Sequence, residues 1–323
     1  MKKKIPTIIT EIINNPPKPV NYAYQKNISY SQMSIFGTCQ HRWKLQYKDK
    51  LKPFSSSIFT VFGSAIHETM QGYLSVMYNV STAAANQINL EDNFQSNFIN
   101  EYQKQYTSNK GSHFSTAEEM REFFEDGMGI LNWFKSRSTK YFSKRGWHLV
   151  GCEVPLIIAP NKMYSNVLYM GFLDIVMYHE PTNTIKIIDI KTSTRGWGDR
   201  DKKNEDKQYQ LLLYKQYFHE QYNFPLDNIE IEFFIVKRKV MDMNDERLLS
   251  PHQSYRVQTF TPPSGKIKLS RAKNAINDFI IKGFNSNGEI KDTNFPKSPS
   301  KFNCGYCPFK KMGEHCTEGL IYS

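Results

Sequence analysis

The sequence of 323 residues lacks several features that would each define a class of protein. No apolar run approaches the roughly 20 residues that a membrane-spanning helix needs. No Gly-x-x-x-x-Gly-Lys-Ser/Thr loop is present, which excludes a motor of the P-loop type. Internal repeats and low-complexity tracts are also absent. With 39% hydrophobic and 14% aromatic residues, the chain can nevertheless bury a substantial core.

Cysteine is scarce, and the five residues present are Cys39, Cys152, Cys304, Cys307 and Cys316. An odd number argues against a disulfide framework. Cys152 lies in the apolar stretch 150–158, so we expect a buried thiol there. The first residues are basic and then briefly apolar, but Glu11, Pro16 and Pro17 interrupt them. A secretory signal is not expected, and the sequence predicts a cytoplasmic protein.

Charge of one sign is in excess, with a formal net charge of +11 and a pI near 9.2. A polyanionic partner explains such an excess, and an inert basic surface is the alternative. Residues 265–311 carry ten Lys or Arg against three Asp or Glu. Shorter basic stretches are Lys237-Arg238-Lys239 and Lys202-Lys203. We expect nucleic acid to lie across these residues.

The hydrophobic pattern predicts an α/β (α+β) chain whose sheet is mixed and flanked by helices. Helices are expected at 31–47 with Ser31 as N-cap, 58–79, much of 85–145, about 206–222 and 270–283. Strands are expected at 149–159, 167–179, 184–192 and 228–239, with a further strand pair within 240–263. Residues 1–27 are expected to be extended.

Two acidic segments fall on neighbouring predicted strands. Asp174 lies in the apolar stretch 169–176, and Asp189-Ile190-Lys191 lies in 185–193. A turn at 180–183 would place residue 174 opposite residue 189, and Asp189 shares a face with Lys191 because side chains alternate. Burying such charges is costly unless a cation or a substrate satisfies them. The arrangement is typical of a hard divalent metal held beside a phosphate.

Four motifs in this order resemble those of the PD-(D/E)XK nuclease superfamily, in its RecB-like branch with an iron–sulfur cluster. That branch includes the nuclease domains of AddAB-type helicase–nucleases and the RecB-like nucleases of CRISPR adaptation. The motifs are the histidine-containing helical segment Gly63–Glu68, Gly-x-x-Asp at Gly171–Asp174, Asp-x-Lys at Asp189–Lys191 and Gln-x-x-x-Tyr at Gln210–Tyr214. A second Asp-x-Lys at 201–203 is interpreted as a solvated loop.

The resemblance implies a restriction-endonuclease-like fold and a role for each motif residue. Asp174, Asp189, the Ile190 carbonyl and His67 would hold Mg²⁺ or Mn²⁺. Lys191 would orient the attacking water and offset charge at the phosphate. Gln210 and Tyr214 would line the site from one helical face. Glu153, on the preceding strand, is a lesser candidate that is expected to face solvent.

Three cysteines near the end of the chain predict a second metal centre. Cys304, Cys307 and Cys316 lie close together, and Cys39 is the natural fourth ligand. Zinc is the alternative, held by four cysteines or by three with His41 or His315. The resemblance favours a 4Fe–4S cluster that fastens the N- and C-terminal segments together.

The sequence therefore predicts one nuclease domain over 1–323. Its parts are N-terminal helices at 28–80, a helical lobe at 81–147, a catalytic sheet and helix at 148–240 and a basic region at 241–323. The expected activity is that of a metal-dependent deoxyribonuclease, an exonuclease on single-stranded or end-exposed DNA in recombination, repair or phage DNA metabolism. A processing endonuclease with a helicase, recombination or CRISPR-like partner, and a non-catalytic nucleic-acid-binding module, are the alternatives.

Overall fold

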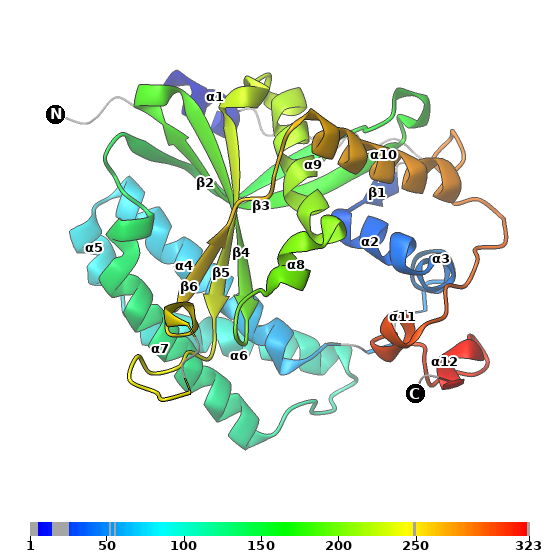
Figure 1. Cartoon of the computed structure of the whole chain (residues 1–323), viewed down its shortest axis with the longest axis horizontal. Helices are drawn as coiled ribbons and strands as arrows, with labels where there is room; N and C mark the ends of the chain where they lie inside the picture. Colours follow the sequence, from blue (N-terminus) through cyan, green and yellow to red (C-terminus); the bar gives the residue numbers. More distant parts are fainter. Residues whose placement is uncertain (1–5, 15–25, 52, 55, 248–249, 322–323) are drawn as a thin grey trace. The chain divides into compact units, whose positions relative to one another are not determined.

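The computed structural model describes residues 6–14, 26–51, 53–54, 56–247 and 250–321 (Figure 1). These residues group into two compact units. The first unit comprises 1–16, 56–155 and 172–263, and the second comprises 17–55, 156–171 and 264–323. The boundary between the units falls within two strands, β2 and β3.

The described strands form a six-stranded mixed sheet in the order β1-β3-β4-β5-β6, in which β2 also pairs with β3. They are β1 (Lys26–Ile28), β2 (Trp147–Ile158), β3 (Val167–His179), β4 (Thr184–Ser193), β5 (Ile229–Lys237) and β6 (Val257–Phe260). β3 and β4 are antiparallel, whereas β4 and β5 are parallel. The mixed sheet with flanking helices confirms the predicted fold class.

The α-helices contain most of the described residues that lie outside the strands. They are α1 (Thr7–Asn14), α2 (Tyr30–Thr38), α3 (Gln40–Trp43), α4 (Ile58–Asn79), α5 (Thr82–Asn86), α6 (Leu90–Ser108), α7 (Ala117–Tyr141), α8 (Asp199–Lys203), α9 (Glu205–Tyr222), α10 (Lys266–Gly283), α11 (Lys301–Gly305) and α12 (Glu318–Ile321). Within the described ranges, no helix combines the length and the apolar character needed to cross a bilayer.

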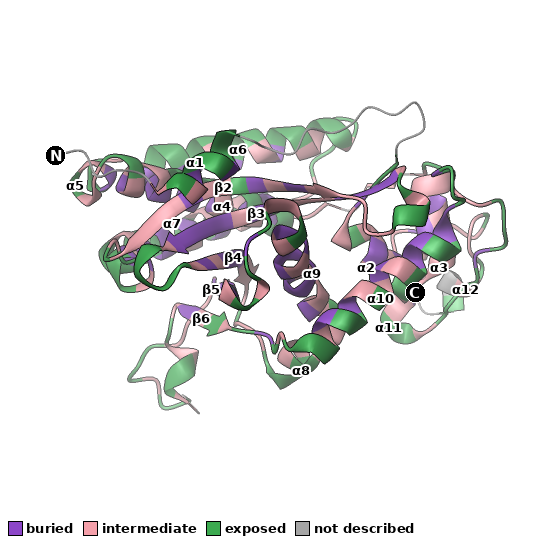
Figure 2. Ribbon diagram, turned by 90° about the horizontal axis from the view of Figure 1, so that it is seen from above, coloured by how far each residue is buried: buried purple, intermediate pink, exposed green. Residues whose placement is uncertain are grey.

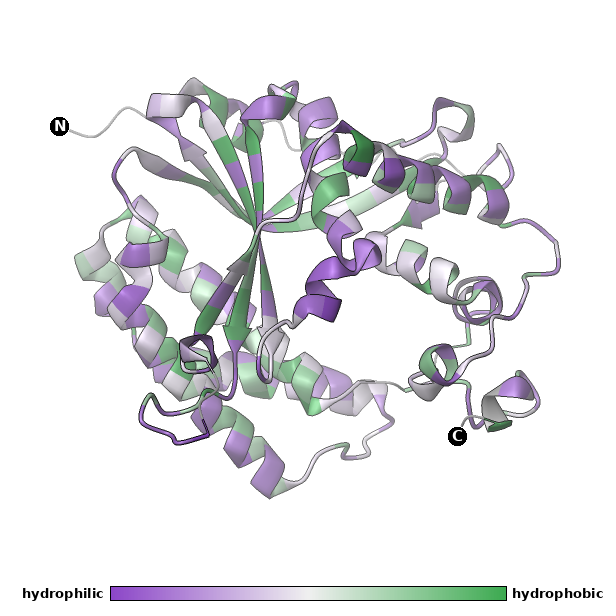
Figure 3. Ribbon diagram, in the orientation of Figure 1, coloured by the Kyte–Doolittle hydropathy of each residue, from purple (hydrophilic) through white to green (hydrophobic). Residues whose placement is uncertain are grey.

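In the first unit, the sheet is covered on both faces. Figure 2 shows α4 and α6 on one side of β3 and β4, and α9 on the other. Ile188, Ile190 and Phe234 share a hydrophobic core with buried residues of α4, α6 and α7. The strands are correspondingly apolar along much of their length (Figure 3), as expected for strands with helices on both faces.

The hairpin between β3 and β4 has the predicted register. Ile175 pairs with Ile188 and His179 with Thr184, so the next pair along places Asp174 opposite Asp189. Residues 180–182 form a single 3₁₀ turn, and Asn183 closes it in the left-handed conformation with φ of 48°. Asparagine tolerates this conformation better than most residues, which fixes the turn and with it the register.

The second unit is organised around one tryptophan. Trp43 has no exposed surface, and aromatic rings from α2, α10 and the chain after α10 surround it. These rings belong to Phe36, Phe279, Phe284 and Phe295, with centroids 5.3–5.7 Å from that of Trp43. Edge-to-face contacts of this kind stabilise beyond the area that they bury.

The structure differs from the sequence prediction in the N-terminal helices. The helix expected at 31–47 is interrupted at Cys39, which is extended with φ of −160°. Its N-cap is Ser29 rather than Ser31, because the Ser29 side chain accepts a hydrogen bond from the Gln32 amide. Interrupting the helix at Cys39 turns the chain at that point and separates α2 from α3.

Two further segments differ from their predictions. Residues 7–14, expected to be extended, form α1, because burial of Ile9 and Ile12 on one face stabilises a helix. The remainder of that N-terminal stretch up to residue 25 lies outside the described residues. Within the described part of 240–263, one strand, β6, pairs with β5 where a strand pair was expected. Turns and a short 3₁₀ helix at Pro251–Gln253 take up the rest.

The packing of α6 against α7 generates a prediction with an internal control. A Cβ on Gly127 would overlap the fully buried ring of Phe94. Gly127→Ala should therefore lower the free energy of unfolding by about 1–3 kcal/mol. Gly129→Ala, in the same helix with nothing within 4 Å, should raise it by up to about 1 kcal/mol. Urea unfolding measures both, and equal effects would contradict this packing.

Candidate active site

α4 brings His67 close to the hairpin because a glycine allows the helix to approach the sheet. Gly63 lies one turn before His67, and a Cβ there would come within 3.1 Å of the Thr192 hydroxyl on β4. The approach leaves His67 Nδ1 3.6 Å from Oδ2 of Asp174. The helical motif and the hairpin therefore meet at one place, within the first unit.

Asp174 is held by the backbone of the opposite strand. Its Oδ2 accepts a 2.7 Å hydrogen bond from the Ile190 amide, and its side chain is only 14% exposed. Burial raises the pKa of this carboxyl from 3.8 to about 6, and the nearby Lys191 opposes the shift. The carboxylate is thus fixed in position but energetically costly to ionise.

Asp189 is buried more deeply than Asp174. It is 1% exposed, and the Lys191 ammonium lies 2.8 Å from its Oδ2. The ammonium is also hydrogen-bonded to this carboxyl. Burial raises the pKa of Asp189 from 3.8 to about 6, with Lys191 opposing and Asp174 adding to the shift. A buried carboxylate that stays costly to ionise even beside an ammonium is a ready ligand for a divalent cation.

His67 is in its neutral form at pH 7 and can donate a nitrogen lone pair to a metal ion. Burial lowers its pKa from 6.5 to about 4, against the opposing influence of Asp189. A hydrogen bond with the backbone of Ile190 also opposes the shift, which places that peptide beside the ring. At neutral pH the imidazole therefore keeps a lone pair free for a metal.

Gln210 and Tyr214 line the other side of the site from α9. The Gln210 side-chain amide donates a 3.1 Å hydrogen bond to the Tyr214 hydroxyl, and Tyr214 is 5% exposed. Burial raises the pKa of Tyr214, and the charges of Asp189 and Asp174 raise it further. The phenol therefore lies close to both carboxylates and stays protonated.

The structure adds two residues that the sequence reasoning ranked low or omitted. Glu153 adopts a φ of 53° within β2, a strained conformation for a residue that is not glycine. Gln71 donates from Nε2 to Glu153 Oε1 at 2.7 Å and to the Asp174 carbonyl at 3.0 Å. The sequence could have predicted a role for Gln71, because Gln71 lies four residues after His67 and hence on the same helical face.

Three of the basic residues predicted to contact nucleic acid, Lys237, Arg238 and Lys239, have partners within the protein. Lys237 is 4% exposed and donates to the His252 carbonyl. Arg238 and Lys239 both pair with Glu122 and Asp126 of α7. Lys202 and Lys203 lie in the short helix α8, so the prediction of a loop at 201–203 is wrong. Their role as nucleic-acid contacts stays a prediction.

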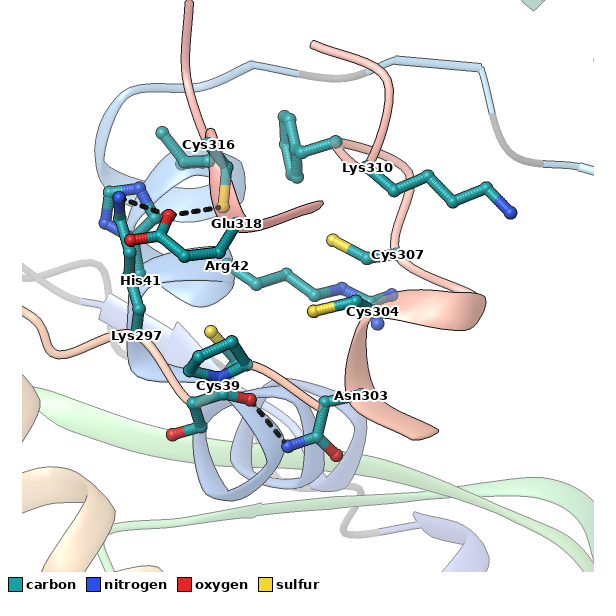
Figure 4. A pocket seen from close by; sticks show the side chains of 14 residues that line it. Cys39, His41, Arg42, Lys297, Asn303, Cys304, Cys307, Lys310, Cys316 and Glu318 are labelled. Atoms are coloured by element: carbon teal, nitrogen blue, oxygen red, sulfur yellow. Dashed lines mark hydrogen bonds and ion pairs between the residues drawn. The ribbon is translucent and has the colours of Figure 1, made fainter. Parts of the chain in front are cut away.

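The four cysteines predicted to act together line one pocket of the second unit (Figure 4). The charges of Cys39 and Cys316 contribute to raising the pKa of Cys307, after the larger effect of burial. Cys152, which is in the first unit, does not line this pocket, and burial raises its pKa to about 11. The structure thus brings the four thiols to one pocket, and their role as ligands of one metal centre stays a prediction.

Hydrogen bonds join the N- and C-terminal segments around the cysteines. Nε2 of His41 lies 3.0 Å from the His315 carbonyl, and the His41 amide donates to the Pro296 carbonyl. The Asn303 side chain donates to the Thr38 carbonyl at 3.2 Å. These contacts bring Cys39 to the three later cysteines, which lie far away in the sequence.

The donor chemistry of both places fits the metals that the resemblance implies. Hard carboxylate oxygens and an imidazole suit a divalent cation such as Mg²⁺ or Mn²⁺, and four thiols suit iron–sulfur or zinc. As arranged here, no three or more His, Cys, Asp or Glu side chains of the described ranges form a group that could hold a metal ion.

Comparisons with known proteins agree with the geometry. A family model described as the PD-(D/E)XK nuclease superfamily matches residues 27–312. A search of curated protein sequences found no match. The matched range contains every residue of the hairpin site.

The raised pKa of Asp189 predicts how stability depends on pH. The folded protein binds more protons than the unfolded chain between about pH 4 and pH 6, so this group lowers stability as pH rises through that range. Metal-free Asp189→Asn should therefore be more stable than the parent by about 1–2 kcal/mol at pH 8. The difference should fade as pH falls towards 4.

Urea unfolding in a chelator measures this difference, and Asp201→Asn is the matched control. The pKa of Asp201 is lowered, chiefly by its hydrogen bond with Lys207, so the same exchange should reduce stability at pH 8. If Asp189→Asn is less stable than the parent at pH 8, the charged form of Asp189 does not destabilise the fold and the account of the buried carboxylate is wrong.

Proposed function

Because the chain belongs to the PD-(D/E)XK nuclease superfamily, and is therefore a nuclease, we propose that it is a metal-dependent deoxyribonuclease whose site is the hairpin of β3 and β4. One observation carries the assignment to this site. Asp174, Asp189, Lys191 and His67 converge there, although burial disfavours the charged forms of both carboxyls and of the imidazole. Such clustering of perturbed groups is typical of a catalytic centre.

Different residues of the site have different roles in phosphodiester hydrolysis. A divalent cation held by Asp174, Asp189, the Ile190 carbonyl and His67 would supply Lewis-acid polarisation of the phosphate and an activated water. Lys191, one-third exposed and 2.8 Å from Asp189, is placed to offset charge at the phosphate and to orient the water.

The remaining residues position these groups. Gln210 and the protonated Tyr214 present hydrogen-bonding groups beside the carboxylates. Gln71 ties Glu153 to the backbone of Asp174, which holds a third carboxylate near the same place. We assign to Glu153 the positioning of a water molecule at the edge of the site.

We propose that the substrate is single-stranded or end-exposed DNA and that cleavage proceeds from an end. The net charge of +11 supports a polyanionic substrate. The resemblance of the motifs to the RecB-like branch supports exonuclease action. A processing endonuclease predicts a different outcome in the experiment below.

The cysteine pocket supports assignment to the branch with a 4Fe–4S cluster. Four thiols line one pocket, together with the cations Arg42, Lys297 and Lys310. Glu318 pairs with Lys297 at 2.6 Å, and Arg42 opposes the rise that burial causes in the pKa of Cys307. Positive charge of this kind favours the thiolate form that a metal centre requires. We propose that the cluster, held by Cys39, Cys304, Cys307 and Cys316, is a structural clasp between the two chain segments.

Replacing Lys191 tests the catalytic assignment. Lys191→Ala should reduce the cleavage rate on the order of 10²- to 10³-fold, because it removes charge stabilisation at the phosphate, while DNA affinity changes little. The matched control is Lys186→Ala, on the same strand and paired with Glu232 at 3.0 Å, which should cleave like the parent. Time courses on end-labelled DNA with Mg²⁺ or Mn²⁺ measure both.

The same assay separates the modes of action. An exonuclease degrades linear single strands and leaves circular ones intact, whereas an endonuclease cuts both. If the parent binds DNA but cleaves neither form with either metal, the protein is a binding module. If Lys191→Ala cleaves as fast as the parent, the catalytic site is misassigned.

The cluster is tested by comparing two cysteine substitutions. Cys304→Ser should remove the visible absorbance of the anaerobically purified protein, lower its iron and sulfide content and loosen the C-terminal segment. Cys152→Ser should keep all three properties of the parent, because Cys152 does not line the pocket. A colourless parent that is folded and contains zinc would overturn the iron–sulfur assignment.

A further inference from the structure

A second cavity lies beside the hairpin site, in the first unit. It is an open cavity of about 480 Å³, and this volume includes space that is open to the surrounding solvent. Its lining consists of Phe59, Thr60, Phe62, Thr192, Ser193, Thr194 and Arg238. None of these residues belongs to the catalytic set, so the cavity requires its own explanation.

Two elements that carry catalytic residues, β4 and α4, also line the cavity. On β4, Thr192 follows Lys191, and Ser193 lies about 7 Å further along the strand than Lys191. On α4, Thr60 lies two turns before His67, which corresponds to about 10 Å. A nucleotide next to a phosphate held at Lys191 is therefore within reach of this cavity.

Arg238 does not give the cavity a strong positive charge. Its guanidinium is 2.6 Å from Asp126 and 2.9 Å from Glu122, and it stacks 4.0 Å from the ring centre of Phe123. The acidic partners offset the charge that the guanidinium would present to a ligand. The cavity is thus better suited to an uncharged group than to a phosphate.

The remaining lining suits a flat heteroaromatic ring. Phe59 is 53% exposed, meets Phe123 edge to face at 4.9 Å and has the Arg238 guanidinium over its ring at 5.7 Å from the centre. These contacts hold the ring in place and leave about half of its surface open. The side chains of Thr60, Thr192 and Thr194 bring hydroxyls that both donate and accept hydrogen bonds. Aromatic stacking with hydroxyls at the rim is how single-stranded bases are bound with little sequence preference.

We propose that this cavity binds a nucleobase of the substrate strand close to the scissile phosphate, stacked on Phe59. The inference rests on the proposed nuclease function and adds a subsite to it. The stacked base holds the strand in register as it reaches Asp189 and Lys191. Because the contacts are stacking and hydroxyl hydrogen bonds, the subsite accepts any of the four bases.

A thermodynamic cycle between protein and DNA tests the subsite. Every protein carries Asp189→Asn to prevent cleavage, and single-stranded oligonucleotides with one abasic position, moved along the strand, are titrated by fluorescence anisotropy. With Phe59 present, one or two positions should weaken binding about 5- to 100-fold when abasic. With Phe59→Leu, the same positions should change Kd by less than about twofold.

Two further variants keep the test decisive. Phe59→Trp, which retains a stacking ring, should restore the dependence on the base. Tyr255→Leu removes an aromatic side chain of the same unit that is 48% exposed and does not line the cavity, and it should leave the profile unchanged.

The outcomes distinguish the subsite from the proposed function. The Asp189→Asn protein could bind single-stranded DNA while abasic positions cost the same affinity with and without the Phe59→Leu exchange. That result overturns the subsite and leaves the nuclease assignment standing. If the Asp189→Asn protein binds no nucleic acid at all, both are overturned.

Discussion

The burial of two carboxylates opposite each other on a hairpin is the constraint on which the site depends. Asp174 and Asp189 lie on neighbouring strands at one register position, and both have pKa values raised to about 6 by burial. The ammonium of Lys191 and the amide of Ile190 reduce this cost but do not remove it. A fold retains such a cost where a bound cation offsets it.

The surrounding elements each contribute one feature to this arrangement. The left-handed Asn183 sets the register of the hairpin, and Gly63 lets α4 approach close enough for His67 to reach Asp174. The strained backbone of Glu153 directs a third carboxylate to the same place, where Gln71 holds it. A strained backbone of this kind persists only where contacts with the neighbouring structure hold it in place.

Much of the fold and the core of the site follow from sequence pattern alone. The helix at 58–79, the strands β3 and β4 and the opposition of Asp174 and Asp189 are all local in origin, since they depend on periodicity and one turn. The interruption at Cys39 and the helix α1 are not, because tertiary contacts decide them. Glu153 was expected to face solvent and is exposed, but its φ of 53° and its contact with Gln71 have no counterpart in an alternating pattern.

The role of the basic residues also could not be predicted from the sequence, because tertiary contacts decide it. Lys237, Arg238 and Lys239 form a run of three in the sequence, but their partners lie on α7, far upstream, or in the loop after β5. A charge pattern predicts that a partner exists, but only packing decides whether it is nucleic acid or the protein itself. The cavity that Arg238 helps to line has no signature in the sequence.

Anomalous diffraction from a crystal soaked with manganese tests the central claim most directly. A peak within coordination distance of Asp174 and Asp189, with His67 and the Ile190 carbonyl completing the ligand set, is the result expected from the buried pair. A well-ordered hairpin with its carboxylates turned apart and no peak between them would contradict it.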